Sequence, residues 1–181
     1  LEPHHIDKLI NSKSGAIIAN LIKQKNLTPD HIDYFLKKNN YHITKGLLDN
    51  KNITLEPHHI DHLISGLIHE VGHRDELTPD HIAHLIKHRA ELETLSKRSD
   101  LLPHHIDGLI KNSKGDIHED SIKLNLSANP NLTHDHIDNL IEHNSMYGEI
   151  NGNLARRDNL STGNIDRLLD SKNEHSDRAL S

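Results

Sequence analysis

Hydrophobic residues recur along the chain in a short pattern that is written seven times. Each copy is a block of ten residues that begins with Leu and carries apolar residues at its sixth, ninth and tenth positions. The blocks "LEPHHIDKLI" from Leu1 and "LTPDHIAHLI" from Leu77 are two examples. Residues three and four positions apart lie on the same side of an α-helix. The pattern therefore predicts one short amphipathic helix in each copy.

The seven blocks organise the whole chain. They begin at residues 1, 27, 55, 77, 101, 132 and 160 of the 181 residues. Self-similarity at such intervals is the signature of a repeat protein, and the unequal spacing indicates that the copies differ in their loops. We interpret residues 1–181 as a single repeat array. Because the sequence starts inside a repeat, it is consistent with a fragment of a longer array.

Each block also begins like a helix. A hydroxyl side chain that can cap the first free backbone N–H groups stands at the second position in four copies: Thr28, Thr78, Thr133 and Ser161. Proline, which fits the first helical position because it lacks an N–H group, follows in five copies: Pro3, Pro29, Pro57, Pro79 and Pro103. These residues predict that the helix starts at the third position of the block.

A second, looser helical pattern lies between the blocks. It is clear in "SGAIIANLIKQKN" and "YHITKGLLDNKN", and least regular in the fifth repeat, between Ile110 and Asn131. One such helical hairpin cannot bury its own apolar side, whereas stacked hairpins can. We therefore predict an all-α solenoid of about seven helix–turn–helix repeats. The low aromatic content of 2% fits a thin core of Leu and Ile.

The repeats resemble a known group of proteins. The segments "ANPNLTHDHIDNLI" and "NLARRDNLSTGNIDRLLD" are similar to degenerate HEAT-like repeats of bacterial and phage proteins, including the leucine-rich-repeat-variant type. The resemblance implies a right-handed superhelix that mainly binds partners. Some HEAT-like relatives bind DNA and a few are DNA glycosylases. The resemblance brings no catalytic motif to this chain.

One string suggests zinc chemistry. Residues 67–73 read "LIHEVGH" and contain the H-E-x-x-H pattern, in which His69 and His73 would ligate zinc and Glu70 would act as general base. We expect this string to form the second helix of the third repeat, with both histidines exposed. The chain continues "RDEL", without the longer metal-binding motif. We therefore interpret the string as structural and keep a zinc hydrolase as a distant alternative.

Histidine is unusually common, with 19 residues, and six stand at the fifth position of a block: His5, His31, His59, His81, His105 and His136. Asn164 replaces histidine in the last copy. In the structural interpretation, which we favour, each ring bonds back to the start of its helix as in a capping box. In the alternative, the rings sense pH or, with neighbours such as His84 and His88, bind metal weakly. Rings kept neutral in the fold predict lower stability at pH 5 than at pH 7.5.

Basic residues gather in and after the second helix of several repeats. The candidate basic edge consists of Lys23, Lys25, Lys45, Lys51, Lys97, Arg98, Arg156 and Arg157. These charges either complement helix dipoles on solvated surfaces or track a phosphate backbone. The net charge of -6 and the scarcity of aromatic residues disfavour strong nonspecific nucleic-acid binding and base stacking.

These observations favour a non-catalytic scaffold for protein–protein interaction. Nucleic-acid binding through the basic edge is the alternative. We expect no enzyme activity, no cofactor and no metal site. The absence of cysteine fits a reducing compartment, so a cytoplasmic location is expected, and no apolar run is long enough to predict a membrane span.

Overall fold

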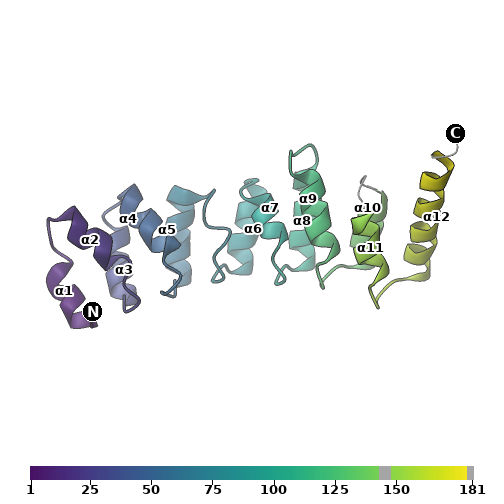
Figure 1. The fold of residues 1–181 in the computed structure, drawn as a ribbon. Coiled ribbons are helices and arrows are strands. Elements are labelled where there is room, and N and C mark those ends of the chain that lie inside the picture. The colour runs from purple at the N-terminus through teal and green to yellow at the C-terminus, as the bar shows by residue number, and fades with distance from the viewer. Residues whose placement is uncertain (143–147, 179–181) are drawn as a thin grey trace. The chain divides into compact units, whose positions relative to one another are not determined.

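The computed structural model describes residues 1–142 and 148–178, and within these residues it contains helices and no strands (Figure 1). This confirms the prediction of an all-α protein. The helices are α1 (Pro3–Leu9), α2 (Gly15–Leu21), α3 (Pro29–Leu36), α4 (Tyr41–Asp49), α5 (Pro57–Leu67), α6 (Pro79–Lys87), α7 (Leu92–Ser96), α8 (Pro103–Ser113), α9 (Glu119–Ser127), α10 (His134–Glu142), α11 (Glu149–Ala155) and α12 (Thr162–Arg178).

Every block starts a helix at its third residue, as the capping residues predict: α1, α3, α5, α6, α8, α10 and α12. The four predicted hydroxyl caps accept hydrogen bonds from the backbone N–H of the fifth block residue. Their donor–acceptor distances are 3.4 Å at Thr28, 3.3 Å at Thr78, 3.3 Å at Thr133 and 3.1 Å at Ser161. The predicted helix starts are therefore confirmed.

The second helices follow the prediction less closely. They are present as α2, α4, α7, α9 and α11. The third repeat has none, because α5 runs for 11 residues and the chain then continues in turns to the next block. The fifth repeat, which looked the least regular, forms α9 over nine residues. The expected second helix of the third repeat was wrong, because residues 68–76 join two blocks that are only 22 residues apart, too close for another helix and its turns.

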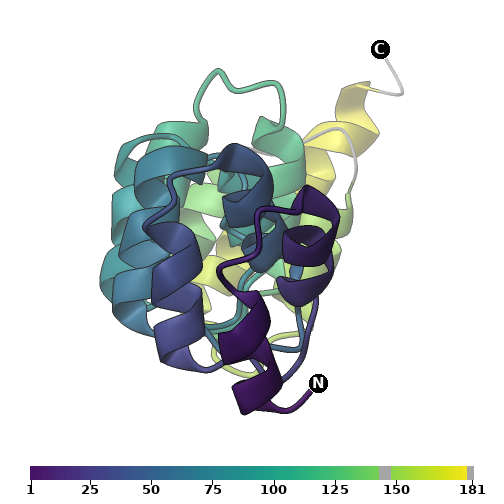
Figure 2. The same ribbon diagram turned by 90° about the vertical axis from the view of Figure 1, so that its left-hand side faces the viewer.

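The chain divides into two compact units, residues 1–82 and 83–181, with the division inside α6. In the first unit, α3 packs on α5 and α2 packs on α4, so that first and second helices form two layers. Figure 2 shows this unit with α1 and α2 nearest the viewer. In the second unit, α10 packs on α12, while α7, α9 and α11 follow one another in the other layer. One continuous array of seven repeats stays a prediction.

The core of each unit consists of the predicted stripes of Ile and Leu. At the sixth, ninth and tenth block positions the apolar residues are buried almost throughout, and Phe35 is fully buried among them. The exceptions are Leu9, Ile165 and Leu169, which are 37%, 45% and 56% exposed. They lie in the first and last helices, which have a neighbouring repeat on one side only in this chain. The stripe is therefore buried where a repeat lies on both sides.

Candidate functional site

The recurrent histidines cap their own helices. In all six copies, ring Nδ1 accepts a hydrogen bond from the backbone N–H of the second block residue, over 3.0 to 3.3 Å. Asn164 makes the same bond through its side-chain oxygen, over 3.0 Å. Because Nδ1 is the acceptor, the neutral ring carries its proton on Nε2. This bond confirms the prediction that each ring caps the start of its own helix.

The same rings also join neighbouring repeats. Nε2 of His31 lies 2.8 Å from Asp7 Oδ1 in the preceding repeat, and Nε2 of His136 lies 3.0 Å from Asp107 Oδ1. His81 pairs with Asp61 in the same way over 3.1 Å. Asn164 donates to Asp138 over 2.6 Å. We name this set of bonds, from the fifth residue of one block to the seventh residue of the block before, the His–Asp ladder.

Sequence reasoning identified the capping bond and missed the ladder. The missed signal is the Asp at the seventh block position, which occurs in six of the seven copies. A carboxylate that recurs together with a histidine two residues earlier predicts a repeated contact once repeats are stacked.

The ladder differs at His59. The exposed neighbour His58 donates from Nε2 to Asp33 Oδ1 over 3.1 Å, while Nε2 of the fully buried His59 lies 3.3 Å from that oxygen without a hydrogen bond. Burial and the adjacent ring of His58 lower the pKa of His59, and they outweigh the opposing charges of Asp33 and Glu56. His59 is therefore held neutral.

Asp33, His58 and His59 also bring three ligand atoms within 4.8 Å of one another, which makes them a candidate metal cluster among the described residues. However, an ion bound to Nε2 of His59 would require the ring proton to move to Nδ1. There it would face the N–H of Glu56, which now donates to Nδ1 over 3.0 Å. Metal binding would therefore cost the capping bond, so the donor set fits hydrogen bonding better than ligation.

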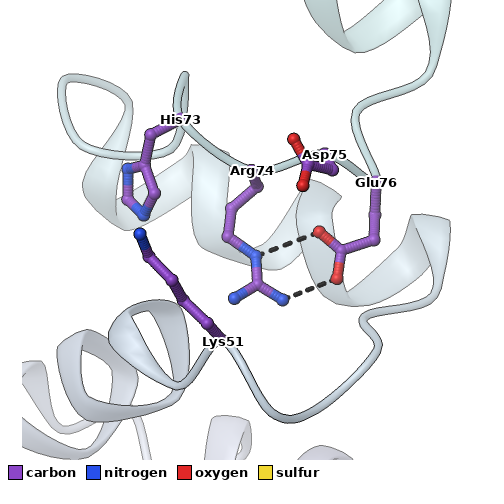
Figure 3. A pocket seen from close by; sticks show the side chains of 5 residues that line it. All are labelled: Lys51, His73, Arg74, Asp75 and Glu76. Atoms are coloured by element: carbon purple, nitrogen blue, oxygen red, sulfur yellow. Dashed lines mark hydrogen bonds and ion pairs between the residues drawn. The ribbon is translucent and has the colours of Figure 1, made fainter.

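A second set of side chains joins the loops between repeats. The buried guanidinium of Arg74 donates to the carbonyl oxygens of Leu48, Asn50 and Ile53 in the preceding loop, over 3.1 to 3.2 Å. It also pairs with Glu76 through two bonds of 3.1 and 2.6 Å (Figure 3). Burial of Glu76 opposes its ionisation, but hydrogen bonds from Arg74 and from the backbone, together with the charge of Arg74, outweigh this effect and lower the pKa of Glu76.

Equivalent positions before later blocks repeat this arrangement. Asn129 donates to the carbonyl oxygen of Arg98 over 2.8 Å, and Arg157 donates to that of Asn129 over 2.7 Å. The hydrogen bonds from Arg98 lower the pKa of Asp100, and burial lowers the pKa of Arg157. These side chains satisfy loop carbonyls that would otherwise lack a partner, which is a structural task.

Figure 3 shows a hollow beside Arg74. Its volume is about 260 Å³, and its lining consists of Lys51, His73, Arg74, Asp75 and Glu76. The Lys51 amine points toward the ring of His73, while Arg74 is turned toward Glu76. Because two carboxylates stand beside the three basic groups, the hollow has no strong preference for an anion or a cation.

The H-E-x-x-H string is not helical. His69, Glu70 and His73 follow the end of α5 in turns, so the expectation of a second helix here was wrong. Both histidines are exposed, as expected. Glu70 pairs with Lys45 over 2.8 Å instead of facing the histidines as a general base. The helical geometry that lets two histidines four residues apart share one zinc is therefore missing.

The histidines in and directly after α6 also do not form one metal site. His81 is occupied by its cap and by Asp61. His84 and His88 lie with their ring centroids 4.5 Å apart, both exposed. Two exposed imidazoles make a weak surface site at most, because a structural zinc uses four protein ligands.

The candidate basic edge separates into two groups. Lys97 pairs with Glu93, Arg98 with Asp100, and Arg157 with loop carbonyls. Lys45 lies between Asp49 and Glu70, whose hydrogen bonds raise the pKa of Lys45. The remaining members are exposed and form no ion pair with any described residue: Lys23, Lys25, Lys51 and Arg156. Phosphate binding by the basic edge stays a prediction.

Comparison with protein-family models, curated proteins and solved structures finds no match to this chain. None of the described helices combines the length and the apolar character that crossing a membrane requires.

Proposed function

We propose that the protein is a non-catalytic helical-repeat scaffold, a HEAT-like solenoid that binds a protein partner. The observation that carries the proposal is the use of the chemically versatile side chains. The recurrent histidines and the loop arginine Arg74 are occupied by bonds within and between repeats. A catalytic site would need such groups to converge on a pocket with free donors or ligands.

The exposed surface supports partner binding. A hollow of about 500 Å³ lies between the end of α3, the start of α4 and α5, and Tyr41 at its margin is 57% exposed. Exposed aromatic residues are frequent anchors in protein interfaces. A repeat protein presents such features along an extended surface, which suits a protein or peptide partner.

Nucleic-acid binding is the second candidate. Four members of the basic edge form no ion pair with a described residue and favour it, because exposed cations can contact phosphates: Lys23, Lys25, Lys51 and Arg156. The net charge of -6 and the internal pairing of the other four members disfavour it. We therefore rank it below protein binding.

A pull-down from host lysate, with this chain as bait and with or without nuclease, tests the proposal. We expect a discrete protein partner that is retained after nuclease treatment. Recovery of nucleic acid, or of proteins that disappear on nuclease treatment, would replace the proposal with the nucleic-acid alternative. A variant with Lys23, Lys25, Lys51 and Arg156 changed to Gln serves as the control, since it should retain a true protein partner.

A further inference from the structure

One step of the chain lacks the carboxylate that the other repeats have. The seventh block residue is Asp in six copies and alanine in the fourth, at Ala83. In the other described steps, this Asp accepts a hydrogen bond from the next repeat, as Asp7 does from His31 and Asp107 from His136. Ala83 offers no oxygen there.

The molecule itself shows which group such a carboxylate would meet. In the third repeat, the exposed ring of His58 donates from Nε2 to Asp33 over 3.1 Å. His104 holds the same block position in the fifth repeat and lies against its neighbour His105 with ring centroids 4.1 Å apart, as His58 does against His59 at 4.0 Å. The equivalent acceptor for His104 would stand at position 83. His104 is exposed and makes no hydrogen bond with any residue that the structure describes.

A cavity occupies the place of the missing group. It has a volume of about 350 Å³ and lies between α6 and α8, with Ala83 and His104 in its lining. Gly108 leaves the α8 side without a side chain, and α8 approaches α6 so closely there that a Cβ would lie 2.8 Å from Ile86 Cγ2. The space is therefore built by small residues on both helices.

The charge around this cavity is positive. Lys87 and Lys111 line it, both are exposed, and neither forms an ion pair with a described residue. No acidic residue belongs to the lining, which is completed by Ile86, His105 and Asn112. The hollow beside Arg74 differs, because two carboxylates line it. Two uncompensated ammonium groups favour an anion in the cavity.

We propose that the cavity between α6 and α8 binds an acidic side chain, Asp or Glu, of a protein partner, which takes the place of the carboxylate missing at Ala83. This inference rests on the proposed function and names the chemistry of the partner. A carboxylate is favoured over a nucleic-acid phosphate because the missing ladder residue is an aspartate, and because the net charge of -6 repels an extended polyanion.

A peptide titration tests the inference. The ¹⁵N-labelled protein is titrated with an acetylated octapeptide of alternating Glu and Ala, and with the matched peptide in which Gln replaces Glu. We expect the Glu peptide to shift the Gly108 amide and the His104 ring signals, and the Gln peptide to leave both unchanged. Equal shifts with both peptides, or none with either, would overturn the inference.

Ala83→Asp is the decisive variant. The new carboxylate restores the residue of the other six blocks and fills the site from within, so the protein should keep its thermal stability and lose at least tenfold in affinity for the Glu peptide. Lys111→Gln should weaken binding, whereas Lys114→Gln, at the C-cap of α8 and outside the cavity, should not. Unchanged binding by Ala83→Asp would place the peptide elsewhere and reject the site.

Two further outcomes separate the explanations. Inorganic phosphate that shifts the same signals and displaces the Glu peptide at equal concentration would identify a phosphate site and overturn the carboxylate assignment. A nuclease-resistant partner in the pull-down together with no response to the Glu peptide would reject this inference and leave the scaffold function in place. Peptide binding without any captured protein would keep the carboxylate site and reject the scaffold function.

Discussion

At the scale of single residues, three of the recurrent histidines perform two tasks with one ring: His31, His81 and His136. Nδ1 accepts from the backbone at the start of its own helix, and Nε2 donates to the preceding repeat, as at His136. Protonation would place a second proton on Nδ1, opposite the backbone N–H, and break the cap. Asn164 performs both tasks without a titrating group. The chain therefore contains its own template for a non-titrating replacement.

His59→Asn should reduce the sensitivity of the fold to acid. The pKa of His59 is lowered in the folded state, so the unfolded chain takes up a proton more readily. Its contribution to stability is present above the ordinary histidine pKa of about 6.5 and is lost as the pH falls below it. Urea unfolding at pH 7.5 and 5.5 should show a smaller loss of stability in His59→Asn than in the wild type.

The matched control is His62→Asn, which changes an exposed histidine on the same helix, α5. His62→Asn should lose as much stability between pH 7.5 and pH 5.5 as the wild type does. Equal losses in the two variants would contradict the role assigned to His59.

At the scale of elements, the bonds of the His–Asp ladder hold consecutive first helices in register. They do so near the helix starts, while the apolar stripe packs further along each helix. The loop bonds of Arg74 and its equivalents hold the connections between repeats. Within each unit, consecutive repeats are therefore joined by polar groups near the helix starts and at the loops, except that Ala83 offers no acceptor to the ladder.

Asp107→Ala should destabilise the second unit. It removes the acceptor from the buried Nε2 of His136, and the expected cost is about 1 kcal/mol because Asp107 is itself well exposed and water can partly replace it. Asp166→Ala is the control, since Asp166 has the same block position and makes no hydrogen bond or ion pair with any described residue. Urea denaturation should show a loss for the first variant, and a comparable loss for both would reject the ladder.

Glycine substitutions should separate packed from open helix surfaces. Gly66→Ala, in α5 with nothing within 4 Å of the new Cβ, should stabilise the fold by about 0.5–1 kcal/mol. Gly108→Ala would place Cβ 2.8 Å from Ile86 Cγ2 and should destabilise the fold by about 1 kcal/mol or more. Thermal melts of the two variants should shift in opposite directions, and shifts of the same sign would refute the close approach of α8 to α6.

At the scale of the whole chain, the periodic features were predictable and the exceptions were not. Helix starts followed from residues such as Thr28 and Pro29, whose effect is local. The sequence did not predict that the third repeat lacks a second helix. The string "LIHEVGH" has a helical apolar pattern, and what prevents the helix is the short distance to the next block. The ladder and the Ala83 cavity depend on neighbouring repeats, so a single repeat does not reveal them.

The most direct test is partner capture by a variant in which five of the six recurrent histidines become asparagine: His5, His31, His59, His81 and His136. The pull-down is repeated with this variant beside the wild type, and the helix content of both is measured by circular dichroism. If the histidines are structural, the variant keeps its helix content and captures the same nuclease-resistant partner. A folded variant that loses the partner would show that the histidines act in binding, and a variant that fails to fold would contradict the equivalence of Asn and His in the ladder.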